Sequence, residues 1–437
     1  MLSIIIILSI ALAIFLGYRT KINTGLFCIV FAYIIGCFVM GLKPKQVIAF
    51  WPTNTMFVIL SVSLFYNFAA INGTLEKMSG ALLYACRNFP GLLPYALFAV
   101  AVILSVMGAT FFTVLAFLAP ITLVICDESR MDKLTGAVAI NCGALAGGNF
   151  PTSNLGVVFR GLSDTAYEAS PEIAAVDSFN MEMKIFAFAI FFSLILITIF
   201  RFGFKENRNI GKGVTFKKPE SFTKDQKTTL TLMMAMMAVV LIFPLLNILM
   251  PGNAAVKYIS GKVDVGLVAI IFTVIALLLK LAPQKEAIAK VPWNTIIMIA
   301  GAGMLIAVAV EAGTIEALST WIGSNVPKPL VPIAFCLVGA TMSFFSSTTG
   351  VVAPALFPLI PNLAASVGLS APVLFACTIL GAQSSAISPF SSGGSLILGS
   401  TPKEEERNEL FNRLLMVAVP ISVITCTIYN FVIAMVL

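Results

Sequence analysis

The sequence contains no histidine, and only 11% of its 437 residues are charged. The lack of histidine removes the commonest general base, metal ligand and proton relay of proteins. Soluble domains carry about 25% charged residues, whereas here 59% of the residues are hydrophobic. Apolar runs long enough to span a bilayer recur along the whole chain. We therefore predict an all-α polytopic membrane protein that is not an enzyme.

Charged side chains are also missing from the middle of the apolar runs. Arg160, Lys280 and Glu311 stand at the ends of such runs, where long side chains are expected to reach the membrane surface. The eight cysteines lie in or beside apolar segments without metal-ligand spacing, so we expect buried small side chains. The net charge of +7 is explained by basic loops beside a membrane and does not require a nucleic-acid partner.

Two pairs of apolar segments are joined too closely for a loop between full crossings. The first pair covers residues 92–126 and turns at Gly108-Ala109, and the second covers 331–366 and turns at Ser347-Thr348-Thr349. We predict that both are re-entrant hairpins, whose irregular tips need protein or water around them. Ten further apolar segments are predicted to cross the bilayer fully.

The longest polar stretch, residues 201–227, sets the predicted orientation. The positive-inside rule places this basic linker in the cytoplasm and both termini in the periplasm of a bacterial inner membrane. Residues 1–18 lack a basic region and a cleavage site, so we interpret them as a retained first span. The basic residues of the linker are Arg201, Lys205, Arg208, Lys212, Lys217, Lys218, Lys224 and Lys227.

The two halves of the chain match at a nearly constant separation. The pattern Pro52-x-Asn54-Thr55 returns 240 positions later, and Pro151-x-Ser153 returns 238 positions later, at Pro389-x-Ser391. Five crossings in each half would turn the second copy upside down. We predict two inverted repeats, each with three spans, an arm helix, a re-entrant hairpin, a broken helix and a last span. The first occupies residues 1–200 with its broken helix at 134–159, and the second occupies 228–437 with its broken helix at 371–398.

Polar residues within the apolar segments gather at the two hairpin tips and in the two broken helices. Pro151 and Pro389 remove a backbone donor, and neighbouring glycines permit unwinding. Unwinding exposes helix N-termini, which attract an anion, and hydroxyl and amide groups add neutral donors. The predicted anion-binding residues are Thr110, Asn149, Thr152, Ser153, Asn154, Ser347, Thr348, Thr349, Ser388, Ser391 and Ser392.

The same segments offer oxygen atoms to a coupling cation. We predict Na⁺ as that ion and no other cofactor, because proton-coupled carriers often use a buried carboxylate or histidine. A proton that travels on the substrate's own carboxyl group stays open as an alternative. The predicted Na⁺ sites involve Gly108, Ala109, Thr110, Gly148, Asn149, Ser347, Thr348, Gly350 and Ser388.

At these residues the chain resembles the ion transporter superfamily. It is similar to the divalent anion:sodium symporters and, more closely, to MatC-type malonate and dicarboxylate carriers, through residues 70–74, 107–109 and 146–151. The resemblance implies symport of a small carboxylate, such as malonate or a C4-dicarboxylate, with sodium. It also implies an elevator mechanism, in which hairpins and broken helices slide against a scaffold that forms a homodimer. The symporters carry Ser-Asn-Thr at each tip, where this chain has Ala109-Thr110-Phe111 and Ser347-Thr348-Thr349.

Other transporter functions stay open on the sequence alone. One is the large membrane subunit of a tripartite periplasmic carboxylate transporter, which needs a binding protein and a small membrane partner. Another is an H⁺-coupled carboxylate carrier.

Overall fold

The computed structural model describes residues 2–436 apart from 21, 86–89, 206, 208–219, 251–252, 261, 345–346 and 402–403. These residues form helices joined by turns and short irregular segments, and they contain no strand. The all-α prediction is therefore confirmed. Part of the predicted linker 201–227 and part of the second hairpin tip lie outside the described residues.

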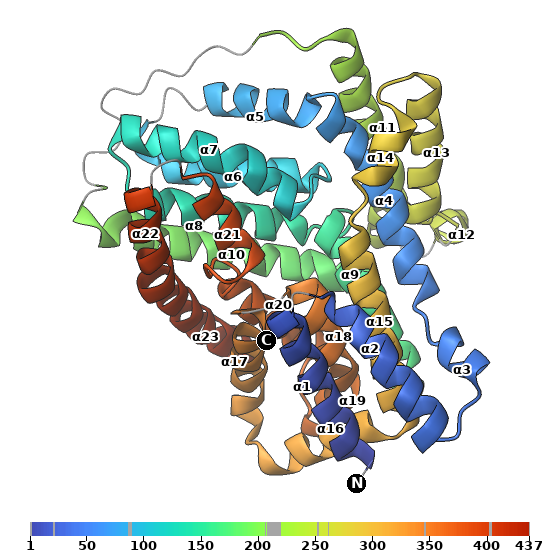
Figure 1. Ribbon diagram of the computed structural model, residues 1–437. Helices are drawn as coiled ribbons and strands as arrows, with labels where there is room; N and C mark the ends of the chain where they lie inside the picture. Colours follow the sequence, from blue (N-terminus) through green and yellow to red (C-terminus); the bar gives the residue numbers. More distant parts are fainter. Residues whose placement is uncertain are drawn as a thin grey trace.

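Figure 1 shows the helices in chain order. In the first half they are α1 (Leu2–Thr20), α2 (Thr24–Tyr33), α3 (Pro44–Ala49), α4 (Thr53–Ile71), α5 (Thr74–Ala85), α6 (Leu93–Val106), α7 (Phe111–Ser129), α8 (Lys133–Gly148), α9 (Asn154–Glu168) and α10 (Ser178–Gly203). A π-helix, Ile34–Val39, continues α2.

In the second half the helices are α11 (Lys224–Leu249), α12 (Ala254–Ser260), α13 (Val265–Leu278), α14 (Gln284–Ala289), α15 (Trp293–Glu311), α16 (Thr314–Asn325), α17 (Val331–Phe344), α18 (Ala353–Leu356), α19 (Ile360–Val367), α20 (Ala371–Ser384), α21 (Ser392–Gly399), α22 (Glu404–Arg413) and α23 (Val419–Val436). A π-helix, Thr348–Val352, precedes α18.

Helices α4 and α15, which occupy matching positions in the two halves, lie side by side and run in opposite directions. Near the end of α4, the Asn67 amide donates to the Ala287 carbonyl, just before the start of α15, at 3.0 Å. Pro52, at the start of α4, packs against Gly303 in the second half of α15. This local arrangement is antiparallel; the inversion of the entire halves stays a prediction.

Glycines allow each hairpin to approach the broken helix behind it. A Cβ added at Gly143 in α8 would lie 2.5 Å from the Phe98 carbonyl of α6. A Cβ at Gly381 in α20 would lie 2.3 Å from the Cys336 carbonyl of α17. Both contacts are too short for any side chain, so glycine at these positions permits backbone-to-backbone packing. The two pairs stand 238 positions apart, which is the separation found in the sequence.

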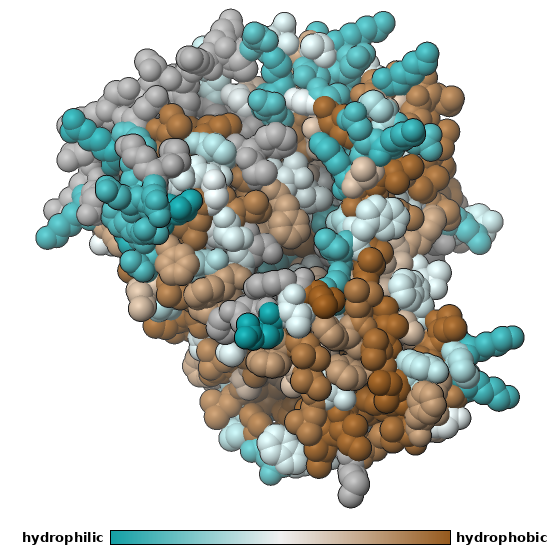
Figure 2. All heavy atoms as spheres, in the orientation of Figure 1, coloured by the Kyte–Doolittle hydropathy of each residue, from teal (hydrophilic) through white to brown (hydrophobic). Residues whose placement is uncertain are grey.

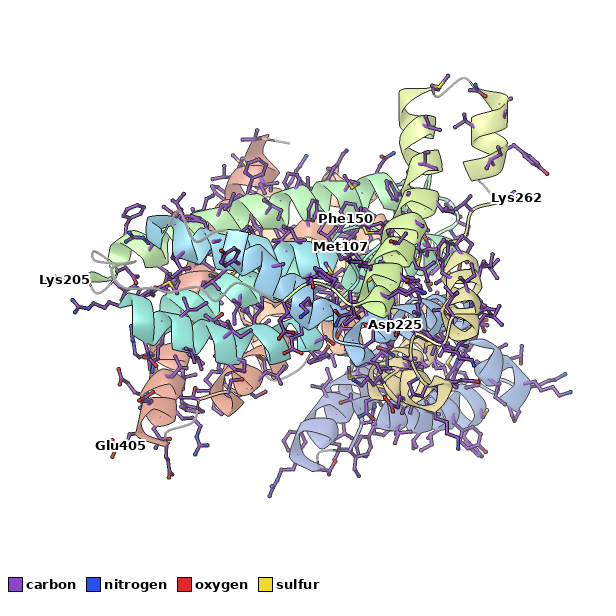
Figure 3. All side chains as sticks on the ribbon, turned by 90° about the horizontal axis from the view of Figure 1, so that it is seen from above. Met107, Phe150, Lys205, Asp225, Lys262 and Glu405 are labelled. Atoms are coloured by element: carbon purple, nitrogen blue, oxygen red, sulfur yellow. The ribbon has the colours of Figure 1, made fainter. Side chains whose placement is uncertain are left out.

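The surface is that of a multi-pass membrane protein. Among the described residues, three helical segments, Ser178–Gly203, Thr348–Val367 and Glu404–Val436, are long and apolar enough to cross a bilayer, and further apolar helices are shorter. Exposed apolar side chains cover α1 and α2 in Figure 2, where lipid would solvate them. Figure 3 shows Lys205 and Glu405 toward one end of the molecule and Lys262 toward the other. The choice of membrane and the side of each terminus stay predictions.

Arg160 is only partly exposed, and its guanidinium contacts neighbouring protein groups. Its Nη1 donates to the Pro151 carbonyl at 3.2 Å, and its guanidinium lies 5.4 Å from the centre of the Phe179 ring. The reason is that α9 continues to Glu168, so residue 160 lies within the helix and faces neighbouring protein. Glu182, near the start of α10, is fully buried.

A cluster of charges ties the two halves together at the start of α8. Asp132 caps α8 by accepting from the Thr135 amide, and its other oxygen binds Arg413 of α22 at 2.6 Å. Lys133 binds Asp127 at 2.9 Å and Glu406 at 2.6 Å. Burial acts to lower the pKa of Lys133, but these two carboxylates outweigh it, so that its pKa is raised.

Candidate functional site

Both predicted broken helices are interrupted at their prolines. Helix α8 ends at Gly148 and α9 begins at Asn154, so Pro151 lies in the gap. Helix α20 ends at Ser384 and α21 begins at Ser392, with Pro389 between them. Proline has no N–H to continue the helix, and its ring clashes with the preceding turn. Each interruption therefore creates a new helix N-terminus inside the protein.

In each interruption a serine hydroxyl makes the same pair of hydrogen bonds to backbone carbonyls. The Ser153 hydroxyl donates to the carbonyls of Phe150, at 2.8 Å, and Gly148. The Ser391 hydroxyl bonds in the same way to the carbonyls of Ser388, at 2.8 Å, and Ala386. A hydroxyl has a single hydrogen, so both serines present only oxygen lone pairs to a further partner. Such oxygens suit a cation better than a carboxylate.

A glycine follows each interruption where a side chain has no room. A Cβ at Gly156 would lie 2.1 Å from the Phe150 carbonyl. A Cβ at Gly394 would lie 2.3 Å from the Ser388 carbonyl. The first turn of each new helix thus folds tightly against the unwound segment, which positions the free N–H groups of that turn.

An amide pair joins the ends of α8 and α20. Asn149 Nδ2 donates to Gln383 Oε1 at 3.0 Å, and Gln383 Nε2 donates to Asn149 Oδ1 at 2.7 Å. Asn149 is fully buried, and Gln383 is nearly so. The sequence prediction included Asn149 for the anion and missed Gln383. The available signal was a single amide side chain inside the apolar run 371–384.

The hairpin tips are turned by backbone geometry and capped by hydroxyls. Gly108 has φ +93° and packs against the Tyr66 ring, so a side chain there would clash. Thr110 caps α7 by accepting from the Thr113 amide at 3.2 Å. Ser347 caps the π-helix by accepting from the Gly350 amide at 3.3 Å. In Figure 3, Met107 of the first tip lies near Phe150 of the first interruption, in agreement with the packing of Gly147 on Ser105.

A cavity of about 480 Å³ lies between the tips, the interruptions, helix α4 and the segment with Lys290 and Pro292 that precedes α15. This volume is within the usual range for small-molecule sites. Predicted residues that line it are Thr110, Asn154, Ser347, Thr348, Thr349 and Ser391. Polar lining residues that the sequence analysis missed are Asn67, Thr113, Lys290, Ser343 and Gln383.

The other predicted residues lie away from the cavity lining. The buried ones are Gly108, Ala109, Gly148, Asn149, Thr152, Ser153, Gly350 and Ser388. Among them, the Thr152 hydroxyl has no hydrogen-bond partner. The Ser392 side chain lies outside the described part of the chain. Within the described residues, no group of three His, Cys, Asp or Glu side chains could hold a metal ion.

The electrostatics of the cavity favour an anion. The first turns of α7, α9 and α21 all contribute to its lining, through Thr110–Thr113, Asn154 and Leu155, and Gly393. Free N–H groups at such helix starts carry partial positive charge. Lys290 is the only charged side chain among the described lining residues. An anion in this cavity would therefore meet positive potential on several sides.

A second cavity, of about 410 Å³, lies toward the far end of α15. Pro52 and Gly303 line it together with Glu168, Glu311 and part of the second hairpin. The 19 residues of α15 span about 27 Å. Helices α4 and α9 line both cavities. The first cavity borders the residues just before α15 and the second borders the later part of α15, and their charged lining residues have opposite sign.

Comparisons with known proteins place both halves of the chain beside transporters. Residues 1–148 match the family model for the N-terminus of the dicarboxylate carrier protein MatC, and residues 255–435 match the model for citrate transporters. These matches confirm the resemblance noted from the sequence. No curated protein matches the chain.

Two solved structures share the fold. The YdaH transporter of Alcanivorax borkumensis gives a TM-score of 0.65 at 17% identity, over 89% of this chain and 87% of that one. MtrF of Neisseria gonorrhoeae, from a class of antimetabolite efflux pumps, gives 0.62 at 14% identity, over 93% of this chain and 84% of that one. At these identities the likeness is one of fold alone.

Proposed function

We propose that this chain, a membrane transporter and not an enzyme, carries small carboxylate anions of the malonate or C4-dicarboxylate type. The observation that carries the proposal is the cavity lined by the starts of α7, α9 and α21, by neutral hydroxyl and amide groups and by Lys290. It contains no acidic side chain among its described lining residues, so a carboxylate would enter without repulsion. The matching family models are those of a dicarboxylate carrier and of citrate transporters, which supports the same substrate class.

In this proposal the anion crosses by an elevator movement. The hairpins and interrupted helices would move as one body past α4 and α15, which belong to the scaffold. The two cavities near opposite ends of α15 support this, because α4 and α9 line both of them. Apolar side chains exposed on the scaffold helices α2 and α13 would be available to form a homodimer.

We further propose Na⁺ as the coupling ion. The hydroxyl oxygens of Ser153 and Ser391 already donate their hydrogens to backbone carbonyls, so their lone pairs remain for a cation. Unwound carbonyls beside them are the other oxygen ligands that such a site needs. A hard cation such as Na⁺ prefers oxygen ligands of this kind.

Uptake by purified protein in liposomes tests the transport proposal. Labelled malonate and succinate are offered with the Ser347→Ala, Thr348→Ala, Thr349→Ala triple variant and with Thr341→Ala as its control. Thr341 is exposed on α17 and bonds to the Leu337 carbonyl away from the cavity. We expect the triple variant to lose uptake and the control to retain it. Full uptake by the triple variant would show that the second hairpin tip does not bind the substrate.

The coupling ion is tested in the same liposomes by imposing one gradient at a time. An inward Na⁺ gradient at constant pH is expected to raise the initial rate of uptake, and Li⁺ or K⁺ gradients are not. A response to an inward proton gradient without any response to Na⁺ would replace sodium by protons as the driving ion.

A further inference from the structure

Lys290 occupies a fixed position at one wall of the cavity. It follows the last residue of the short helix α14, and its amide donates to the Glu286 carbonyl at 3.0 Å. Two hydrogen bonds hold the backbone just before Lys290: the Asn67 amide donates to the Ala287 carbonyl, and the Trp293 indole donates to the Ile288 carbonyl at 3.1 Å. These bonds hold the chain in place at the point where the lysine side chain leaves it.

The charge of Lys290 stands out against its surroundings. The other polar groups of the described lining, most of them at hairpin tips and helix starts, are neutral hydroxyls, amides and backbone N–H groups. No acidic side chain among the described residues forms a salt bridge with Lys290. The lysine is exposed, and it borders the cavity without being engaged by the protein.

The matching position in the first half shows that this lysine is not part of the repeated pattern. Phe50 stands 240 positions before Lys290, and it lines the second cavity. That cavity has Glu168 and Glu311 as its charged lining residues. Among the described lining residues, the positive charge is therefore present only in the first cavity, beside the start of α15.

We propose that Lys290 selects dianions over monoanions, by neutralising the carboxylate that the hairpin tips and helix starts do not hold. This inference rests on the proposed carboxylate transport. One carboxylate would lie against the N–H and hydroxyl donors of the moving body, and the other would face the ammonium group on the α14 side. A monocarboxylate would use the first set of donors alone.

Substitution at Lys290 should therefore change selectivity more than rate. In Lys290→Gln we expect the half-saturating concentration of succinate to rise about fivefold, the upper range for a partly exposed ion pair. Inhibition of uptake by a monocarboxylate such as butyrate is expected to stay within about twofold of the wild type. Lys290→Arg should keep dianion selectivity, and Lys290→Glu should lose more of it than Lys290→Gln.

Lys285 provides a matched control, because it is an exposed lysine on the same short helix and does not line the cavity. Lys285→Gln removes the same charge and is expected to behave like the wild type. Because exposed charges are screened by salt, the loss in Lys290→Gln should shrink at about 0.5 M ionic strength.

The outcomes separate this inference from the proposed function. If the wild type moves neither dicarboxylates nor monocarboxylates, the proposed function fails, and the role of Lys290 fails with it. If the wild type moves dicarboxylates but Lys290→Gln weakens both classes equally, or Lys285→Gln has the same effect, only the selectivity proposal is overturned. Thermal-shift titration of detergent-solubilised protein with succinate and butyrate gives the same comparison without transport.

Discussion

The buried amide pair of Asn149 and Gln383 allows a quantitative test of how the two halves are joined. Each amide both donates to and accepts from the other, at 3.0 and 2.7 Å. Replacing Gln383 by Met keeps the side-chain length but leaves both polar atoms of Asn149 without partners. A buried polar group without a partner costs about 1–3 kcal/mol. We therefore expect Gln383→Met to lower the free energy of unfolding by about 2–6 kcal/mol.

The reciprocal change, Asn149→Leu, should cost a similar amount, because it strands the Gln383 amide. Combining both changes replaces a satisfied polar pair by an apolar pair of similar shape, and such an exchange is often nearly neutral. The double variant is thus expected to be more stable than the sum of the single costs predicts, with a coupling energy of about 2 kcal/mol or more.

Equilibrium unfolding in mixed micelles, followed by far-ultraviolet circular dichroism, measures these free energies. The same four proteins are compared in uptake, since Gln383 also lines the cavity. Additive costs, with a double variant as unstable as the two single changes together, would refute the reasoning. They would mean that water or a ligand satisfies each amide independently.

Two further predictions concern packing and charge. Gly156→Ala or Gly394→Ala should each cost about 1–3 kcal/mol of stability and reduce uptake, because a Cβ there meets a carbonyl at 2.1 or 2.3 Å. Gly399→Ala is the control, because Gly399 has open space around it. Equal losses in all three variants would contradict the steric argument. Arg413→Met should lower the free energy of unfolding by about 3 kcal/mol, because it leaves the buried Asp132 carboxylate without its ion-pair partner. Adding Asp132→Asn should recover most of that loss in thermal unfolding. If the second change deepens the loss, the ion pair is not its cause.

Local sequence predicted the helices and their interruptions well where the cause is local. Proline cannot continue a helix, so the gaps around Pro151 and Pro389 follow from residue type. Low charge and long apolar runs determine an all-helical membrane protein, because backbone groups in lipid must be satisfied within the helix. The family resemblance, now supported in both halves, rests on the same short motifs.

Which residues line the cavity depends on distances between segments far apart in the chain, and the sequence alone does not contain those distances. Ser153 and Ser391 are in the predicted motifs, yet their hydroxyls donate to nearby backbone carbonyls and are not free to donate to a ligand. Gln383 is a single polar residue in an apolar helix, and only the packing of α8 against α20 pairs it with Asn149. Arg160 looked like the end of a span until α9 was seen to continue beyond it.

Residue chemistry by itself determined what kind of molecule this is: a helical membrane protein with two matching halves, proline-interrupted helices and clusters of neutral hydrogen-bond donors. Tertiary structure alone decided which of those donors share one cavity, and that Lys290, from a loop that reads as ordinary surface, borders it. The physical reason is that helix breaks are encoded within a few neighbouring residues. The cavity forms only where segments separated by hundreds of positions pack together, and side-chain type does not record that geometry.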